Sequence, residues 1–329
     1  MNTDLAFHQR TLLRGYLLAA YVLLILYASL SPFSGWQEQG LAFWDVLVSP
    51  LVQTYNSFDA LSNLLAYIPL GLLLALTWAT RFSAGGSLLL TLCCAVMLSA
   101  GLEYVQMYLP NRTSSNADIL SNGLGALAGA ILAALLANRA WFVRITQWRI
   151  ELFQRGAAVD FGLTLVMLWM FAQINPSLPM LGNVFITEAA HRIFVTMPEE
   201  PFSLWESAAV ALNLLMVGML LQTLMRARRH SVVALMSILS VVALAKFVAA
   251  AVLLKSWALL LWLNSEAMLG IVVGLLLMWA TNWLPRMYLL WTAALVALGY
   301  LVLALWVLDS GTPTAAMRLY QWLMGLLLE

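Results

Sequence analysis

Charged residues are scarce in this chain. Asp, Glu, Lys and Arg make up 9% of its 329 residues, whereas soluble domains contain about 25%. Hydrophobic residues make up 63%, and the mean hydropathy is +0.89. This composition excludes an ordinary soluble domain and predicts an all-α, polytopic membrane protein, a bundle of transmembrane helices in a lipid bilayer.

The chain also lacks the residues that indicate nucleic-acid, metal or disulfide sites. The net charge is +1 and the basic residues are scattered among hydrophobic segments, so no nucleic-acid partner is expected. Cys93 and Cys94 are adjacent within a hydrophobic run, which predicts buried thiols and neither a disulfide framework nor a metal site. No cofactor, phosphate-loop or catalytic motif is recognisable, so no cofactor is expected and enzymatic activity stays open.

Hydrophobic runs of about 20 residues predict nine membrane spans. They lie near residues 14–31, 59–79, 87–107, 118–137, 157–175, 203–224, 231–254, 259–283 and 287–308. The first is interpreted as a retained span because it is long and no small-x-small cleavage site follows it. Residues 315–328 are hydrophobic but short, which predicts an interfacial helix, with a tenth span as the alternative.

Basic residues are distributed unevenly between the two sets of alternating loops. One set contains eleven of the sixteen Lys and Arg residues, namely Arg10, Arg14, Arg81, Arg139, Arg144, Arg149, Arg155, Arg226, Arg228, Arg229 and Arg286. The other set contains Arg112, Arg192, Lys255 and Arg318, and Lys246 lies within a predicted span. Because cytoplasmic loops carry the basic excess, we expect a cytoplasmic N-terminus, with loops 32–58, 108–117 and 176–202 outside.

A sparse internal repeat suggests that the chain consists of two halves. Asp59, Gly71 and Arg81 recur 147 positions later as Glu206, Gly218 and Arg228, and Gly125 and Gly129 recur 145 positions later as Gly270 and Gly274. The pattern predicts a four-helix domain over 1–150, a degenerate parallel repeat over 151–286, and an extra span with the interfacial helix over 287–329. Chance correspondence among helices rich in Leu and Ala is the alternative.

One predicted span begins with polar residues and continues with small ones. Helical residues three, four and seven apart share a face, so Asp118, Asn122, Gly125 and Gly129 form one stripe. Small residues at this spacing are typical of a helix packed closely against its neighbours. The carboxylate is therefore expected to face the bundle and not the lipid.

The two preceding spans carry acids and amides at the same outer level. Ala95, Ser99, Glu103 and Gln106 share one face, and Asp59 and Asn63 are one turn apart. Arg112 lies in the short outer loop between two of the three spans. The residues predicted to form one outward-facing ligand site are Asp59, Asn63, Glu103, Gln106, Arg112, Asp118 and Asn122.

The segments FDALSNLLAYIPLGLLLAL and GLEYVQMYLPNRTSSNADILSNGLGALAGA resemble the VanZ-like family, bacterial membrane proteins named for a member associated with teicoplanin resistance. The resemblance covers about residues 14–137. The family pattern is filled by Asp59, Asn63, Pro69, Gly71, Glu103, Gln106, Pro110, Arg112, Asp118, Asn122 and Gly125. It implies a multi-pass protein of the bacterial inner membrane acting at the cell envelope, but no particular reaction and nothing about the chain after residue 151.

Three functional classes fit a site of this composition. In the first, Arg112 binds a phosphate, while the acids and amides accept hydrogen bonds from the hydroxyls of a lipid-linked glycan or peptidoglycan precursor. The second is catalysis on a lipid-linked substrate, with one carboxylate as general base. The third is transport or flipping, but transport sites tend to lie near the bilayer midplane, whereas these residues lie at span ends.

Structural roles are the alternative for the same residues. Asp59 and Asp118 are suited to cap the spans that they begin, where the helix dipole favours an acid. This interpretation is weaker for Glu103, because an acid near a helix C-terminus opposes the dipole. Arg112 is equally suited to form a structural salt bridge with one of the acids.

Three further residues are secondary candidates. Lys246 either snorkels to the interface or pairs with Glu206 or Glu266. His191 and Arg192 lie in the long outer loop, which we expect to fold over the bundle as an amphipathic lid.

The topology can be tested with single cysteines introduced into a background that lacks Cys93 and Cys94. Because the basic loops are expected in the cytoplasm, Ser57→Cys, Ser115→Cys and Ser203→Cys should react with a membrane-impermeant thiol reagent in intact cells, whereas Ser83→Cys and Arg149→Cys should not. Labelling at position 149 would reverse the proposed orientation.

Overall fold

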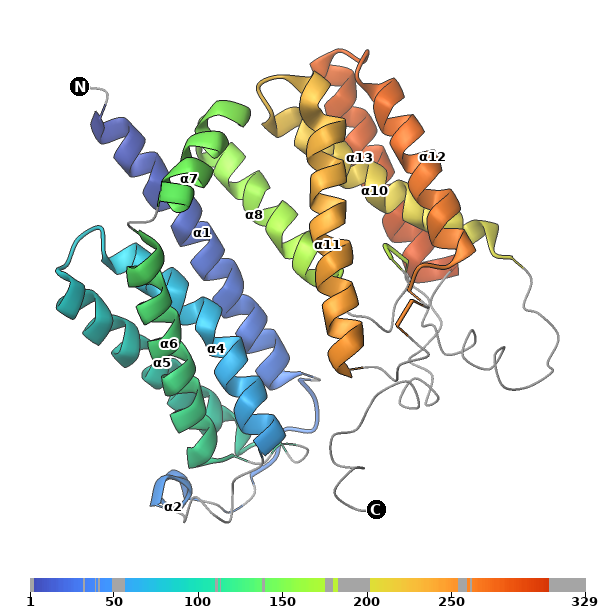
Figure 1. Ribbon diagram of the computed structural model, residues 1–329. Helices are drawn as coiled ribbons and strands as arrows, with labels where there is room; N and C mark the ends of the chain where they lie inside the picture. The colour runs from blue at the N-terminus through green and yellow to red at the C-terminus, as the bar shows by residue number, and fades with distance from the viewer. Residues whose placement is uncertain are drawn as a thin grey trace. The chain divides into compact units, whose positions relative to one another are not determined.

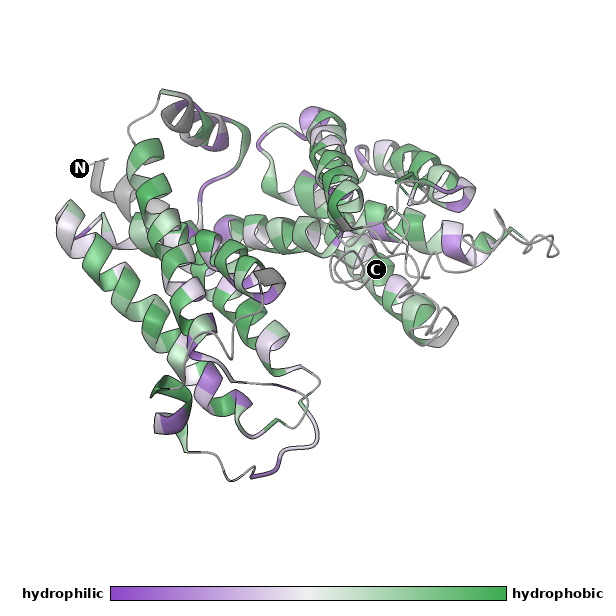
Figure 2. Cartoon of the chain, turned by 60° about the horizontal axis from the view of Figure 1, so that its bottom comes forward, coloured by the Kyte–Doolittle hydropathy of each residue, from purple (hydrophilic) through white to green (hydrophobic). Residues whose placement is uncertain are grey.

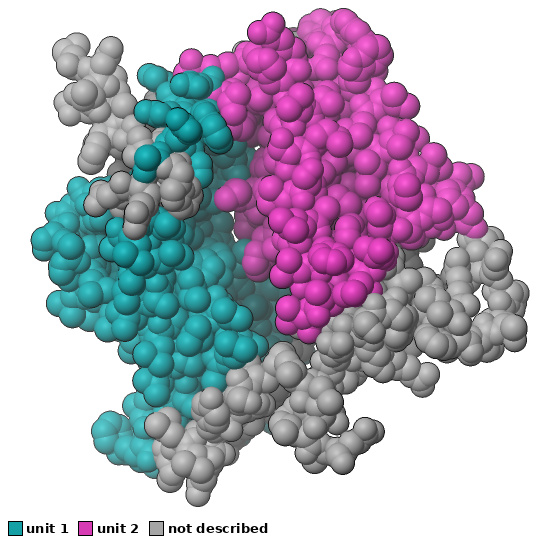
Figure 3. Space-filling view, in the orientation of Figure 1, with its two compact units in different colours: residues 1–151, 155–164 teal, residues 152–154, 165–329 magenta. Residues whose placement is uncertain are grey.

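The computed structural model describes residues 3–31, 33–38, 40, 42–48, 57–109, 112, 114–137, 140–174, 180–182, 202–253, 259–260 and 262–307. Throughout these residues the fold is helical, which confirms the predicted fold class (Figure 1). The chain forms two compact units, residues 1–151 with 155–164, and residues 152–154 with 165–329 (Figure 3). His191, Arg192 and the tail 315–328 lie outside the described residues.

The first unit is built from four long helices: α1 (Thr3–Leu30), α4 (Ser57–Trp78), α5 (Ala84–Gln106) and α6 (Asn116–Ala137). The short α2 (Phe43–Val48) lies at the end of the bundle where α4 and α6 begin (Figure 1). There Asn116 donates a hydrogen bond to the carbonyl of Leu47 at 3.2 Å. Since α5 ends where α4 and α6 begin, the three helices bring their polar termini to one end of the unit.

The closest helix contact in this unit is between α4 and α6. A Cβ at Gly125 would lie 2.2 Å from the carbonyl oxygen of Leu64, and one at Gly129 would lie 2.0 Å from that of Ile68. From the other side, a Cβ at Gly71 would lie 2.1 Å from the carbonyl oxygen of Ala126. The glycines therefore allow the two backbones to touch, which confirms the predicted close packing of this stripe.

Helix α5 contributes one buried face to the bundle. Its buried residues include Thr91, Ala95, Ser99 and Glu103, as the spacing predicted, and Ala95 joins a core with residues of α1, α4 and α6. Cys93 is exposed and Cys94 is intermediate. The prediction that both thiols are buried is thus wrong, because Cys93 lies outside the buried face of α5 that contains Thr91, Ala95 and Ser99.

Two shorter helices follow α6: α7 (Ala140–Leu152) and α8 (Ala157–Ala172). Helix α8 begins in the first unit and ends in the second unit. Arg149 of α7 forms an ion pair with the buried Asp160 of α8. The basic segment after α6 is thus itself helical.

The second unit contains α10 (Leu204–Leu224), the 3-10 turn η1 (Arg228–His230), α11 (Ser231–Leu253), α12 (Ser265–Thr281), α13 (Arg286–Val302) and the π-helical turn η3 (Leu303–Val307). Helix α10 is the most buried span. A Cβ at Gly270 of α12 would lie 2.6 Å from the carbonyl oxygen of Ser207 in α10. In the second unit too, a helix that contains glycines, α12, packs closely on another helix, α10.

The two glycine contacts differ in register. Gly125 meets Leu64, whose counterpart 147 positions later is Ala211, but Ala211 is met by Gly274 and not by Gly270. The second contact is therefore shifted by one helical turn relative to the sequence correspondence. The internal repeat stays a prediction.

Seven described helices are long and hydrophobic enough to cross a membrane: Leu12–Leu30, Asp59–Trp78, Ala84–Gln106, Asn116–Leu136, Leu204–Leu224, Arg228–Val252 and Met287–Leu305. In Figure 2 the hydrophobic residues, in green, occupy most of the length of the long helices. Two other predicted spans form the shorter α8 and α12, of 16 and 17 residues. Helix α12 begins later than predicted because the side chain of Asn264 caps it, accepting from the amide of Ala267 at 2.8 Å.

The glycine contact between α4 and α6 predicts a large effect of a single methyl group. Gly129→Ala should lower stability by about 1–3 kcal/mol, because its Cβ would meet backbone atoms that cannot rotate away. Gly101→Ala in α5 is the control, since its Cβ would meet nothing within 4 Å and alanine favours helix by about 1 kcal/mol. Thermal unfolding in detergent should show a lower midpoint only for Gly129→Ala, and equal midpoints would contradict the close contact.

Candidate functional site

A polar cavity of about 420 Å³ lies within the first unit, at the end where α4 and α6 begin and α5 ends. All seven residues predicted for the ligand site line it. The complete lining is Ile25, Ala28, Ser29, Asp59, Ser62, Asn63, Ala66, Tyr67, Leu102, Glu103, Gln106, Arg112, Asp118 and Asn122. Helix α1 contributes the first three, a participation that the spacing of polar residues in the sequence did not predict.

Asp118 is directed toward α4. It is the third residue of α6, and its Oδ1 accepts a hydrogen bond from Asn63 Nδ2 at 2.8 Å. The start of α6 is capped by Ser115, whose hydroxyl accepts from the amide of Ala117 at 3.1 Å. The capping role proposed for Asp118 therefore belongs to Ser115, and the Asp118 carboxylate is engaged with a side chain of the cavity.

Glu103 is buried, with 4% of its surface exposed. Its Oε2 accepts a hydrogen bond from the amide of Ser115 at 2.9 Å, and its backbone carbonyl accepts one from the Ser114 hydroxyl at 2.8 Å. One carboxylate oxygen therefore holds the loop that leads into α6. Glu103 has a structural contact in addition to its position in the cavity wall.

Two residues that line the cavity each have a buried oxygen without a partner in the described residues. Asn122 donates from Nδ2 to Ser99 Oγ at 2.8 Å, but its Oδ1 accepts no hydrogen bond. The hydroxyl of Tyr67, a residue that is 4% exposed, also has no partner. Because buried polar atoms are nearly always hydrogen-bonded, such atoms in a cavity wall indicate a place for a ligand or water.

Arg112 is exposed and directed toward α1. Its guanidinium donates to the carbonyl oxygens of Ala28 and Ser31 at 3.0 and 3.4 Å. Basic groups stabilise the free carbonyls at a helix C-terminus, so this residue ties the outer loop to the end of α1. Among the described residues it forms no ion pair with an acid, so the predicted salt bridge is replaced by this contact.

The remaining polar residues define the rim of the cavity. Gln106 donates from Nε2 to the carbonyl of Ser29 at 2.9 Å, which joins the end of α5 to α1. Asp59 is exposed in the first turn of α4, beyond the N-cap position, and Ser62 lies close to it in sequence. The rim thus contains a carboxylate and a hydroxyl, and the deeper wall contains the buried Glu103, Tyr67 and Asn122.

The sequence interpretation missed Tyr67, which lines the cavity, and Ser115, whose amide binds Glu103. Tyr67 lies four positions after Asn63 and therefore on the same helix face, a spacing that identifies it. Ser115 had the cap signature, a serine directly before a hydrophobic helix. Nothing in the sequence indicated that its amide would bind Glu103.

Lys246 lies in the second unit and is 1% exposed. Its Nζ donates to the carbonyl of Gln173 at 2.9 Å. The amine is therefore buried, and the snorkelling interpretation is wrong. Pairing with Glu206 or Glu266 stays a prediction.

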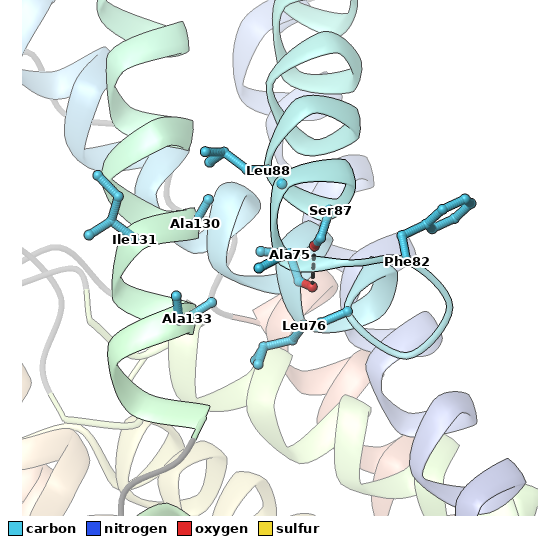
Figure 4. A pocket seen from close by; sticks show the side chains of 12 residues that line it. Ala75, Leu76, Phe82, Ser87, Leu88, Ala130, Ile131 and Ala133 are labelled. Atoms are coloured by element: carbon cyan, nitrogen blue, oxygen red, sulfur yellow. Dashed lines mark hydrogen bonds between the residues drawn. The ribbon is translucent and has the colours of Figure 1, made fainter.

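A second cavity, of about 500 Å³, lies at the opposite end of α4, α5 and α6 and is lined mainly by alanines (Figure 4). Its polar side chain, Ser87, donates to the carbonyl of Ala75 at 3.1 Å. This apolar pocket therefore offers van der Waals contact and no polar recognition. Among the described residues, no group of His, Cys, Asp or Glu is placed to hold a metal ion.

Aromatic residues gather beside the polar cavity. Tyr104 makes edge-to-face contacts with Phe43 of α2 and with Tyr108, with ring centroids 5.6 and 5.7 Å apart. The hydroxyls of Tyr104 and Tyr108 share a hydrogen bond at 3.2 Å, which, with the electrostatic effect of Tyr104, raises the pKa of the exposed Tyr108. Tyr and Trp concentrate at membrane–water interfaces, and this end of the first unit has that composition.

These features define a multi-pass helical membrane protein with a polar cavity at one end of its first bundle. Residues 13–137 match the family model VanZ/LLP1. This part of the chain is therefore similar to the VanZ-like family, as the resemblance over about residues 14–137 indicated. Comparison with curated proteins and with solved structures gives no match.

The partnerless hydroxyl of Tyr67 predicts an unusual response to truncation. Tyr67→Phe should leave the unfolding midpoint unchanged or raise it, because an unsatisfied buried hydroxyl costs about 1–3 kcal/mol. Tyr21→Phe is the matched control, since its hydroxyl donates to the carbonyl of Ala66 at 2.7 Å and its loss should cost about 1 kcal/mol. Equal destabilisation by both changes would show that Tyr67 has a protein partner.

Proposed function

We propose that this protein binds a polar group of a lipid-linked or glycan component of the bacterial cell envelope, such as a peptidoglycan precursor, in the polar cavity. It does so from the inner membrane, with its N-terminus in the cytoplasm and the cavity facing outward. The family name connects the proposal with teicoplanin, which acts on the envelope, and altered glycopeptide susceptibility is the expected cellular effect.

The observation that carries the proposal is the convergence of polar groups from separate segments on one cavity. Acids and amides from α4, α5 and α6 line the same 420 Å³ space, and two of its buried oxygens have no partner in the described residues. A purely structural cluster would satisfy these atoms internally. A ligand with several polar groups completes the missing hydrogen bonds.

The position of the cavity favours binding over transport. Asp59 and Asp118 lie in the first turns of α4 and α6, and Glu103 lies in the last turn of α5. Transported substrates and coupling ions are usually held near the midplane, at discontinuous helices. A site at helix ends instead suits a headgroup that stays at the interface while its lipid tail remains in the bilayer.

Neutral isosteres of Glu103 and Asp118 test the proposal. Glu103→Gln and Asp118→Asn should abolish the effect on teicoplanin susceptibility, because they remove the charge that recognises the ligand. Both should keep the fold, since an amide oxygen can still accept from Ser115 and Asn63. Membrane abundance and thermal stability should stay unchanged or rise slightly.

Asp45→Asn is the matched control, because this exposed acid of α2 does not line the cavity. It should retain full activity. Full activity of the Glu103 and Asp118 variants, or activity lost only in proportion to protein abundance, would assign these acids a structural role and move the search to the loop around His191.

A further inference from the structure

The side-chain donors of the polar cavity are already directed at protein acceptors. The amides of Asn63, Gln106 and Asn122 and the guanidinium of Arg112 each donate to a carboxylate, a hydroxyl or a backbone carbonyl. These bonds hold the helices and the loop in place. Each of these groups has further N–H donors, so the acceptors and the charge decide which ligand the cavity favours.

The acceptor oxygens of the lining residues are only partly engaged. Asn122 Oδ1 and the Tyr67 hydroxyl have no partner in the described residues. The described hydrogen bonds of Asp118 and Glu103 use one carboxylate oxygen of each. The cavity thus presents acceptor oxygens at its deeper wall, and a complementary ligand supplies hydrogen-bond donors.

The charges of the lining residues also favour a ligand that donates hydrogen bonds. Asp59, Glu103 and Asp118 give the cavity three carboxyl groups, and Arg112 is the cation in its lining. That guanidinium is engaged with the carbonyls at the end of α1. A phosphate would approach three acids and one cation, so net electrostatics disfavour the phosphate-binding role expected for Arg112.

We infer that the group recognised in the polar cavity is a protonated primary amine, carried by a lipid headgroup or by an amino sugar; this inference rests on the proposed function and specifies its ligand. An ammonium has three N–H donors and no acceptor, which matches the oxygens of Glu103, Asp118, Asn122 and Tyr67. Its charge complements the carboxyl groups, and charge-assisted hydrogen bonds are the stronger kind. A sugar hydroxyl supplies a donor without the charge.

The inference is tested by native mass spectrometry of the full chain with lipids of identical acyl chains. Phosphatidylethanolamine carries a primary ammonium, phosphatidylcholine a cation without N–H groups, and phosphatidylglycerol hydroxyls without a cation. We expect phosphatidylethanolamine to bind about tenfold more tightly than the other two, the effect of one charge-assisted hydrogen bond. Glu103→Gln should remove this preference, whereas Asp45→Asn should keep it.

The source of the amine is distinguished by competition. Glucosamine and glucose are added separately to the complex with phosphatidylethanolamine. Displacement by glucosamine but not by glucose supports recognition of an amine on a sugar, and displacement by neither, with the lipid preference intact, supports a lipid headgroup. Equal displacement by both sugars would overturn the inference that an amine is recognised.

The remaining outcomes separate this inference from the proposed function. Equal binding of phosphatidylcholine, or preference for phosphatidylglycerol, overturns the inference that the cavity recognises an amine. Binding of a neutral glucosyl diacylglycerol that depends on Glu103, without binding of phosphatidylethanolamine, overturns the amine and retains the proposed function. If no probe binds in a manner that depends on Glu103 or Asp118, both proposals fail.

Discussion

The direct contact between the backbones of α4 and α6 is the constraint on which the first unit depends. Gly125 and Gly129 bring α6 against carbonyl oxygens of α4, and Gly71 does the same in the other direction. Lipid tails provide little hydrophobic drive for helices to associate, so close packing of small residues supplies much of it. The same contact sets the register that places Asn63 beside Asp118. The geometry of the polar cavity therefore follows from three glycines further along the helices.

Glu103 illustrates how a site residue acquires two roles. Its carboxylate binds the amide of Ser115 and so fixes the start of α6, while the same side chain forms part of the cavity wall. An acid at the C-terminal end of α5 opposes the dipole of its own helix, but it accepts from the N-terminal end of the next one, where the dipole favours it. The unfavourable position predicted from one helix is thus offset by its neighbour.

The sequence was sufficient for the fold class and for seven polar residues of the cavity, though not for Tyr67, because helical periodicity shows which residues share a face. Asp118, Asn122 and the glycines were predicted from spacing alone. Periodicity does not identify the partner of each face, so the contribution of α1 and the binding of Arg112 to its carbonyls were not predictable. Helix boundaries depend on individual caps such as Asn264, and the exposure of Cys93 depends on how many faces of α5 meet protein.

The two cavities of the first unit have a consequence for permeation. The polar cavity and the apolar pocket occupy opposite ends of the same helices, and between them lie Leu70, Ala95 and Ala126, all almost completely buried. The bundle therefore has a cavity at each end and a closely packed middle. A continuous path between the two cavities would require these buried side chains to move, and with them the contact between α4 and α6 that the glycines make.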